Sequence, residues 1–224
     1  MNHPSTFPFI DLQMFKAQAL AVITKPADFF RAMPLTGGLK EPFLFVVAVG
    51  IIAAVLQAVF AVFISIGTAV ATLLFTPVIL GIFSFVGAGV AFLIWKMMGS
   101  SHNYEVAYRC IAYSFAILPI NLILSVIPYA GGVAGTAWGM YLAYVASVEV
   151  HRIAAQKAKW VWGILFVVSA LMGIQSEVTT RRMENALQQL EQQVGKDGIS
   201  PEEASRITAE FLQGLKNAAP PDGQ

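Results

Sequence analysis

Six polar residues in an otherwise apolar part of the chain are the candidates for chemistry. They are His102, Glu105, Arg109, Asn121, Glu149 and His151. Glu105 and Arg109 stand four apart, in the favourable order for a helical ion pair, and Glu149 can join them if its segment lies alongside. We interpret the cluster as an interfacial charge clamp that fixes helix depth, with a functional site as the alternative.

Imidazole and carboxylate groups are metal ligands, and the set holds His102, Glu105, Glu149 and His151. No HExxH-like spacing commits these four to one ion. The sequence also contains neither a glycine-rich phosphate loop nor a G-x-S-x-G nucleophile motif. Its single cysteine, Cys110, excludes an intramolecular disulfide and a multi-thiolate metal site. We therefore expect no catalytic residue, metal or cofactor, and no enzyme activity.

The elements that position these residues are membrane helices. Of 224 residues, 57% are hydrophobic and only 12% are charged, whereas about 25% are charged in a typical soluble domain. The net charge of +1 gives no global field to attract nucleic acid. The composition indicates an integral membrane protein whose principal partner is the lipid bilayer.

Five apolar segments predict five transmembrane helices. A helix needs about 20 residues to cross a bilayer, and each segment is close to this length or longer. They cover about 43–66, 73–98, 104–127, 132–150 and 158–174. The third contains Pro119, which predicts a kink, and the second ends at Trp95 and Lys96, a pair suited to a membrane interface. The last is at the short end of the spanning range. The fold class predicted is an all-α polytopic helical bundle, with residues 42–174 as its membrane domain.

Small residues at every fourth position predict where these helices pack, because they let helix backbones approach closely. The longer row is Gly131, Gly135, Gly139, Ala143 and Ser147, and a shorter row is Gly50, Ala54 and Ala58. We expect leucine at Gly135 or Gly139 to disrupt assembly more than a polar change at Leu142.

The two flanks differ from the membrane domain. Residues 1–41 form an amphipathic segment in which Phe9–Ile23 predicts an interfacial helix, followed by a short helix whose Phe29 and Phe30 suit an interfacial anchor. Residues 175–224 predict a soluble helical hairpin with a mobile tail.

Positive charge sets the expected orientation. Lysines and arginines precede the first span and surround the second and fourth connections, while the first and third connections, 67–72 and 128–131, carry none. The positive-inside rule places the N-terminus in the cytoplasm, and five crossings place the C-terminus outside. We expect a multi-pass protein of a bacterial inner membrane.

Several of these segments resemble the Yip-domain family of multi-span proteins, named for interaction with Ypt/Rab GTPases. The resemblance covers about residues 24–174 and is carried by Lys25–Arg31, Gly37–Pro42, Arg109–Ser114 with Pro119, and Val148–His151 with Ala158. It implies a five-span fold with a cytoplasmic N-terminus. Eukaryotic members of the family are membrane adaptors in vesicle traffic that bind small GTPases.

Two functions follow as hypotheses. The first is a non-enzymatic adaptor or membrane-organising protein that binds protein partners, or itself, through the membrane domain and the C-terminal hairpin. The alternative is an oligomeric small-solute or ion transporter, or a channel, in which Asn121 and the Glu105, Arg109 and Glu149 cluster line a path.

Overall fold

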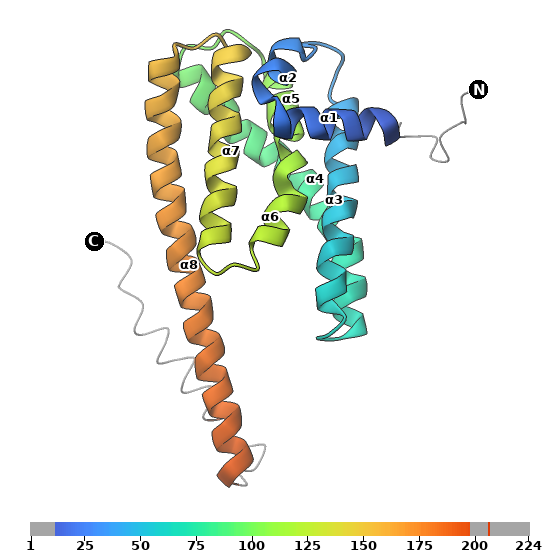
Figure 1. The fold of residues 1–224 in the computed structure, drawn as a ribbon, viewed down its shortest axis with the longest axis vertical. Helices are drawn as coiled ribbons and strands as arrows, with labels where there is room; N and C mark the ends of the chain where they lie inside the picture. Colours follow the sequence, from blue (N-terminus) through green and yellow to red (C-terminus); the bar gives the residue numbers. More distant parts are fainter. Residues whose placement is uncertain (1–11, 198–205, 207–224) are drawn as a thin grey trace, which may run out of the picture. The chain divides into compact units, whose positions relative to one another are not determined.

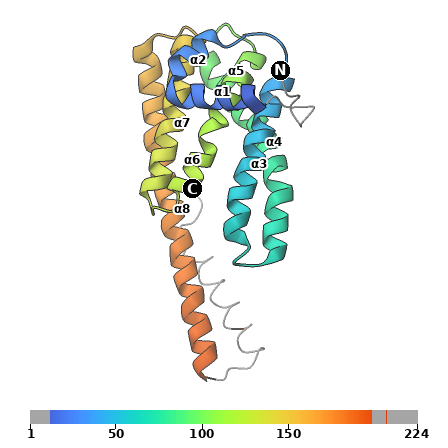
Figure 2. The same ribbon diagram turned by 45° about the vertical axis from the view of Figure 1, so that its right-hand side comes forward.

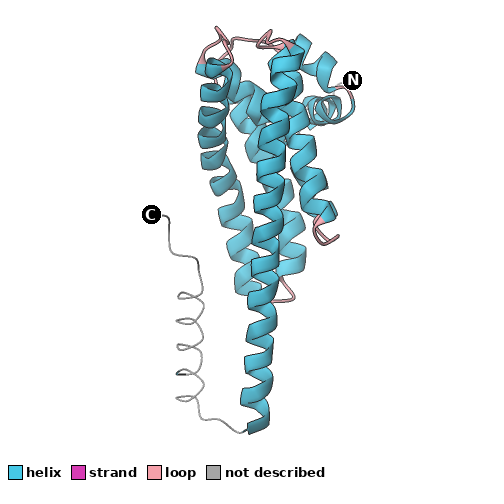
Figure 3. Cartoon of the chain, turned by 90° about the vertical axis from the view of Figure 1, so that its left-hand side faces the viewer, coloured by secondary structure: helices cyan, strands magenta, loops and turns pink. Residues whose placement is uncertain are grey.

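The computed structural model describes residues 12–197 and Arg206, which contain helices and no strand (Figures 1 and 3). The chain divides into two units, residues 1–174 and 175–224. The helices are α1 (Leu12–Thr24), α2 (Pro26–Ala32), α3 (Lys40–Ala61), α4 (Ile66–Met97), α5 (Tyr104–Ser114), the 3₁₀ turn η1 (Phe115–Ile117), α6 (Leu118–Leu124), α7 (Ala130–Glu149) and α8 (Ala155–Asp197). The predicted all-α membrane helical fold is confirmed.

Four helical segments are long and apolar enough to cross a bilayer. They are Lys40–Ala61, Ile66–Met97, Tyr104–Leu124 and Ala155–Gln188, and they make this a multi-pass membrane protein. The helix α7 has 20 residues, but its glycine, tyrosine and tryptophan residues lower its hydropathy, and it is not among the four. The total of five crossings therefore stays a prediction.

The first connection lies earlier in the chain than the hydropathy indicated. The helix α3 ends at Ala61, and α4 begins at Ile66, so the turn is 62–65 and not 67–72. Ser65 starts α4 as its N-cap, because its backbone is extended and its hydroxyl accepts a hydrogen bond from the Thr68 amide at 3.0 Å. Apolar residues on both sides of Ser65 concealed this boundary.

The third span is broken, as its proline predicted. The helix α5 ends at Ser114, the 3₁₀ turn follows, and α6 starts with Pro119 in its first turn. Proline has no amide hydrogen and its ring collides with the carbonyl four residues earlier, which belongs to Phe115. Ser114 donates to the Cys110 carbonyl at 2.8 Å beside the break.

The α3–α4 hairpin packs through small residues, and the two helices lie side by side in Figure 2. A Cβ atom added to Gly50 would lie 3.1 Å from Cα of Pro77, so α4 crosses close to this glycine. Ala54 is also buried, whereas Ala58 is only partly buried. Two of the three small residues in this row therefore lie in the tightly packed contact.

The predicted packing face of α7 divides into a tight and an open part. A methyl group at Gly131 would overlap the Leu124 carbonyl, and one at Gly135 would lie 2.8 Å from Cγ of Asn121. Gly139 has open space where a Cβ would project. These contacts make α6 and α7 close neighbours across the short turn between them.

Farther along α7, Ala143 and Ser147 are buried. Leu142 is also completely buried, although it lies outside the row of small residues. Within one chain, leucine at Gly139 would meet no neighbour, whereas a polar group at Leu142 would be completely buried, which argues against the expected order for Gly139. The effect on assembly stays a prediction.

The amino-terminal platform comprises α1, α2 and residues 33–39. The helix α1 lies across α3 near the start of that helix (Figure 1), and its Phe15 ring is 5.1 Å from that of Phe45. Val22 is fully buried, while Met14 and Leu20 are exposed. The first part of the predicted Phe9–Ile23 helix, residues 9–11, lies outside the described residues.

The aromatic pair of α2 anchors this platform to protein and not to the interface. Phe30 is 1% exposed, and Phe29 packs edge-on against Tyr113 with a centroid separation of 5.2 Å. Trp95 was likewise expected at the interface, and it is completely buried. Hydropathy does not distinguish an aromatic residue that faces headgroups from one that faces a neighbouring helix.

The last apolar segment continues without a break into the polar region. The helix α8 runs from Ala155 to Asp197, so the expected fifth span and the first helix of the expected hairpin are one helix. The second helix of that hairpin and the tail lie outside the described residues, except for Arg206.

Candidate functional site

The six candidate polar residues do not form one cluster. Five of them occupy three separate contact sites where the platform and the loops around residues 98–103 and 150–154 meet, and Asn121 lies apart on α6. The residues that complete these sites come from segments remote in sequence.

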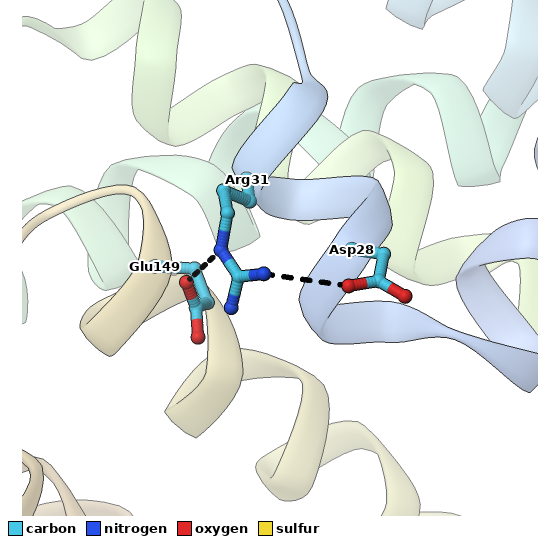
Figure 4. Close-up of polar contacts among 3 residues, drawn as sticks. All are labelled: Asp28, Arg31 and Glu149. Carbon is cyan, nitrogen blue, oxygen red and sulfur yellow. Dashed lines mark hydrogen bonds and ion pairs between the residues drawn. The ribbon is translucent and has the colours of Figure 1, made fainter.

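In the first site, Arg31 of α2 joins Glu149 at the end of α7 (Figure 4). Its Nε donates to Oε2 of Glu149 at 2.9 Å, and its Nη1 lies 3.4 Å from Oδ1 of Asp28. A carboxylate at a helix C-terminus is disfavoured by the helix dipole, so Glu149 needs a cation nearby. The hydrogen bond and charge of Glu149 in turn raise the pKa of Arg31.

In the second site, Glu105 and Arg109 bind the backbone of Gly38. Oε1 of Glu105 accepts a hydrogen bond from the Gly38 amide at 2.6 Å, and Nη1 of Arg109 donates to the Gly38 carbonyl at 2.9 Å. Gly38 has a φ of +80° and the preceding Gly37 has a φ of +121°. Both angles are costly for residues with a side chain.

In place of the predicted helical ion pair, Glu105 and Arg109 therefore both bind the backbone of Gly38, one at its amide and the other at its carbonyl. Arg109 is 1% exposed, and its ion pair is with Glu41, with Nη2 3.6 Å from Oε2. A buried guanidinium must be compensated by acceptors. Here the Gly38 carbonyl of the platform and the Glu41 carboxylate in the first turn of α3 do this.

In the third site, two histidines pack against Ser100. Nδ1 of His151 lies 2.7 Å from the Ser100 hydroxyl, which also accepts from the His102 amide at 3.2 Å. The face of the His151 ring stacks on the Trp95 ring, with a centroid separation of 4.1 Å. Burial, followed by the charges of His102 and Lys96, lowers the pKa of His151 to about 3, so this ring is neutral near pH 7.

Ser147 extends the third site into the helix packing. Its hydroxyl accepts from the indole Nε1 atoms of both Trp95 and Trp162, each at 2.7 Å, and donates to the Ala143 carbonyl at 2.7 Å. Since Trp95 is on α4 and Trp162 is on α8, one fully buried hydroxyl links three helices. The sequence pattern identified Ser147 as small but carried no sign of these two donors.

Asn121 is separate from these sites. Its side chain packs against Gly135, and its Oδ1 is buried and accepts no hydrogen bond in the described part of the chain. No hydrogen bond or ion pair among the described residues connects Asn121 to Glu105, Arg109 or Glu149.

The arrangement is suited to holding segments together. Within residues 12–197 and at Arg206, no group of three or more His, Cys, Asp or Glu side chains is placed to hold a metal ion. The side chains of Glu149, Glu105, Arg109 and His151 each bind another group of this chain. The partners missed from sequence were Arg31, Gly38, Glu41 and Ser100, of which only the paired glycines gave a local signal.

The segments that carried the family resemblance contact one another in space. The Lys25–Arg31 segment meets Val148–His151 through the Arg31–Glu149 pair, and Gly37–Pro42 meets Arg109–Ser114 through Gly38, Glu41 and Arg109. The family model for the Yip1 domain matches residues 20–176, which include all these contacts. Comparison with curated proteins and with solved structures found no match. Because the matched region covers most of the chain, the protein belongs to the Yip1 domain family.

Proposed function

We propose that this protein is a non-enzymatic membrane adaptor that presents its amino-terminal platform to a partner protein. The observation that carries the proposal is the binding of Gly38 by Glu105 and Arg109. These contacts tie the platform to a membrane helix through two charge-assisted hydrogen bonds, one of them from the buried Arg109 side chain, which favours one fixed position of the platform. Polar groups used in this way serve as a scaffold.

The platform also has a surface suited to protein contact. A groove of about 360 Å³ lies between α1 and α2 and is lined by both charged and apolar side chains, including Lys25, Asp28, Phe29, Met33 and Tyr113. Mixed polar and aromatic surfaces are typical of non-obligate protein interfaces.

We further propose a bacterial inner membrane with the platform in the cytoplasm. Lysines and arginines ahead of α3 and around the second and fourth connections support this orientation, since cytoplasmic loops are enriched in these residues. Those around the two connections are Lys96, Arg109, Arg152, Lys157 and Lys159. With five crossings, residues 175–224 emerge on the opposite side.

Site-specific photo-crosslinking in cells tests the adaptor role. A photoreactive residue at Gln18, which lines the platform groove, should give a discrete protein adduct, and the same residue at Val59 on α3 should give none. Arg109→Gln should remove the adduct because it releases Gly38. Equal adducts at Gln18 and Val59 would contradict the proposal.

Two further measurements separate the alternatives. Solute or ion flux in reconstituted vesicles that is lost in Asn121→Leu or Glu149→Gln would indicate a transporter or channel instead. Cysteine labelling of sealed vesicles tests the orientation. Lys16 and Gln175 replaced by cysteine in turn should react from opposite sides, and reaction from the same side would refute five crossings.

A further inference from the structure

Lys159 lies where two apolar grooves meet on the first turns of α8. The first groove, about 420 Å³, lies between α7 and α8 and includes Tyr141, Tyr144 and Trp162. The second, about 480 Å³, lies along α8 itself and includes Trp160 and Val167. Lys159 and Gly163 line both grooves.

Gly163 keeps the two grooves continuous below the lysine. It follows Lys159 by one helical turn, so the two residues lie on the same face of α8. A Cβ at Gly163 would have nothing within 4 Å. The missing side chain therefore leaves a shallow strip that joins the grooves directly beneath the charged group.

Lys159 differs from the two neighbouring lysines in its contacts. Lys96 donates to the Ser101 carbonyl at 3.4 Å, and Lys157 donates to the Met98 carbonyl at 3.0 Å. Among the described residues, Lys159 has neither a hydrogen bond nor an ion pair, and it is exposed. Its ammonium group is therefore available to an anion from outside the chain.

The surroundings of Lys159 are those of a membrane interface. Trp160 is 65% exposed, and Tyr141 is 43% exposed, and tryptophan and tyrosine concentrate at the level of lipid headgroups. Farther along the helix, Ile164, Val167 and Val168 are exposed apolar residues that continue the second groove. The distance from Lys159 to Val168 is about 14 Å at 1.5 Å per residue, enough for much of one acyl chain.

We propose that Lys159 and these grooves bind one anionic diacyl phospholipid. The ammonium group of Lys159 pairs with the lipid phosphate, and one acyl chain lies in each groove on either side of Gly163. Basic pockets between membrane helices recognise anionic headgroups in this way. The charge complementarity of a single unpaired lysine favours an anionic over a zwitterionic lipid. This site is independent of the partner-binding role proposed for the platform.

Tryptophan quenching by brominated lipids tests the site in the full-length protein. Trp160 and Trp162 line the two grooves, so a bound brominated chain quenches both. The probes are brominated phosphatidylglycerol and brominated phosphatidylcholine in detergent micelles. We expect phosphatidylglycerol to quench at about fivefold lower concentration, the factor that corresponds to one lysine–phosphate attraction at a membrane surface.

Two variants and two matched controls define the outcome. Lys159→Gln should abolish the preference for phosphatidylglycerol. Gly163→Leu should weaken the binding of both lipids, because the leucine side chain fills the strip that joins the grooves. Lys16→Gln, an exposed lysine on α1, and Gly173→Leu, a second glycine of α8 with open space around it, should change nothing.

Three outcomes would overturn the proposal. They are equal quenching by the two lipids, a preference that survives in Lys159→Gln, and a change in the mass of the intact particle in Gly163→Leu, which would make the groove a contact between copies of this chain.

Discussion

Ser147→Ala should destabilise the membrane domain more than any other removal of a single oxygen atom among the described residues. The change deletes the acceptor of two indole N–H groups, those of Trp95 and Trp162, whose bonds are both 2.7 Å long. Trp95 is completely buried, and Trp162 is 6% exposed, so water cannot readily replace the lost oxygen. Alanine retains helix propensity and leaves room for only a small rearrangement.

The size of the effect follows from the two stranded donors. An unsatisfied buried donor costs about 1–3 kcal/mol in proteins generally, and hydrogen bonds between membrane helices average about 0.6 kcal/mol. Two such donors place the loss near 2–4 kcal/mol in the free energy of unfolding. Adding Trp162→Phe to Ser147→Ala removes one of the two unsatisfied donors. The double variant should therefore lose about 1 kcal/mol less free energy of unfolding than the sum of the losses in the two single variants.

Thiol reactivity provides the assay. Cys110 is the sole cysteine and is completely buried, so its labelling by a maleimide across an SDS titration reports opening of the core. Ser114→Ala is the control, because Ser114 donates only within its own helix, to the Cys110 carbonyl. A loss in Ser147→Ala no greater than in Ser114→Ala, or strictly additive variants, would refute the two-donor explanation.

Three other predictions concern the same stability. The variants are compared by the same labelling, whereas the pH series is followed by tryptophan fluorescence across the SDS titration, because a protonated thiol reacts poorly with a maleimide. Gly135→Leu should destabilise the protein by more than about 2 kcal/mol because it collides with Asn121, whereas Gly139→Leu has room and should change stability by less than about 1 kcal/mol. Stability should fall as pH decreases from about 6.5 towards 3, by up to about 1.4 kcal/mol per pH unit, because the His151 imidazole binds a proton only when unfolded; its folded pKa is about 3. Arg109→Lys should lose about 1–3 kcal/mol, because lysine cannot span both the Gly38 carbonyl and Glu41.

Each of these has a contrary result. Equal losses at Gly135 and Gly139 would mean that the α6–α7 contact is not tight. A His151→Gln variant with the same slope below pH 6.5 would assign the pH dependence to another group. Full stability in Arg109→Lys would show that the buried guanidinium is not needed to hold the platform.

Much of the architecture could be predicted from the sequence because it depends on local properties. Apolar length predicts helices that cross a bilayer, and Pro119 predicts the break before α6, since the missing amide hydrogen acts within one turn. The Gly37–Gly38 pair indicates a connection in which the backbone can adopt positive φ angles without a steric penalty. Gly131 and Gly135 similarly mark a close approach of α6 and α7, because no side chain fits there.

Only the tertiary structure decided which residues meet. Periodicity showed that Ser147 is small, but not that indoles from α4 and α8 converge on it, since those donors are 52 and 15 residues away. Glu105 and Arg109 looked like a local pair, yet both bind the backbone of Gly38, about 70 residues earlier in the chain, which holds the platform against α5. Helix spacing determines which side chains share a face, whereas the packing of distant helices determines what that face contacts.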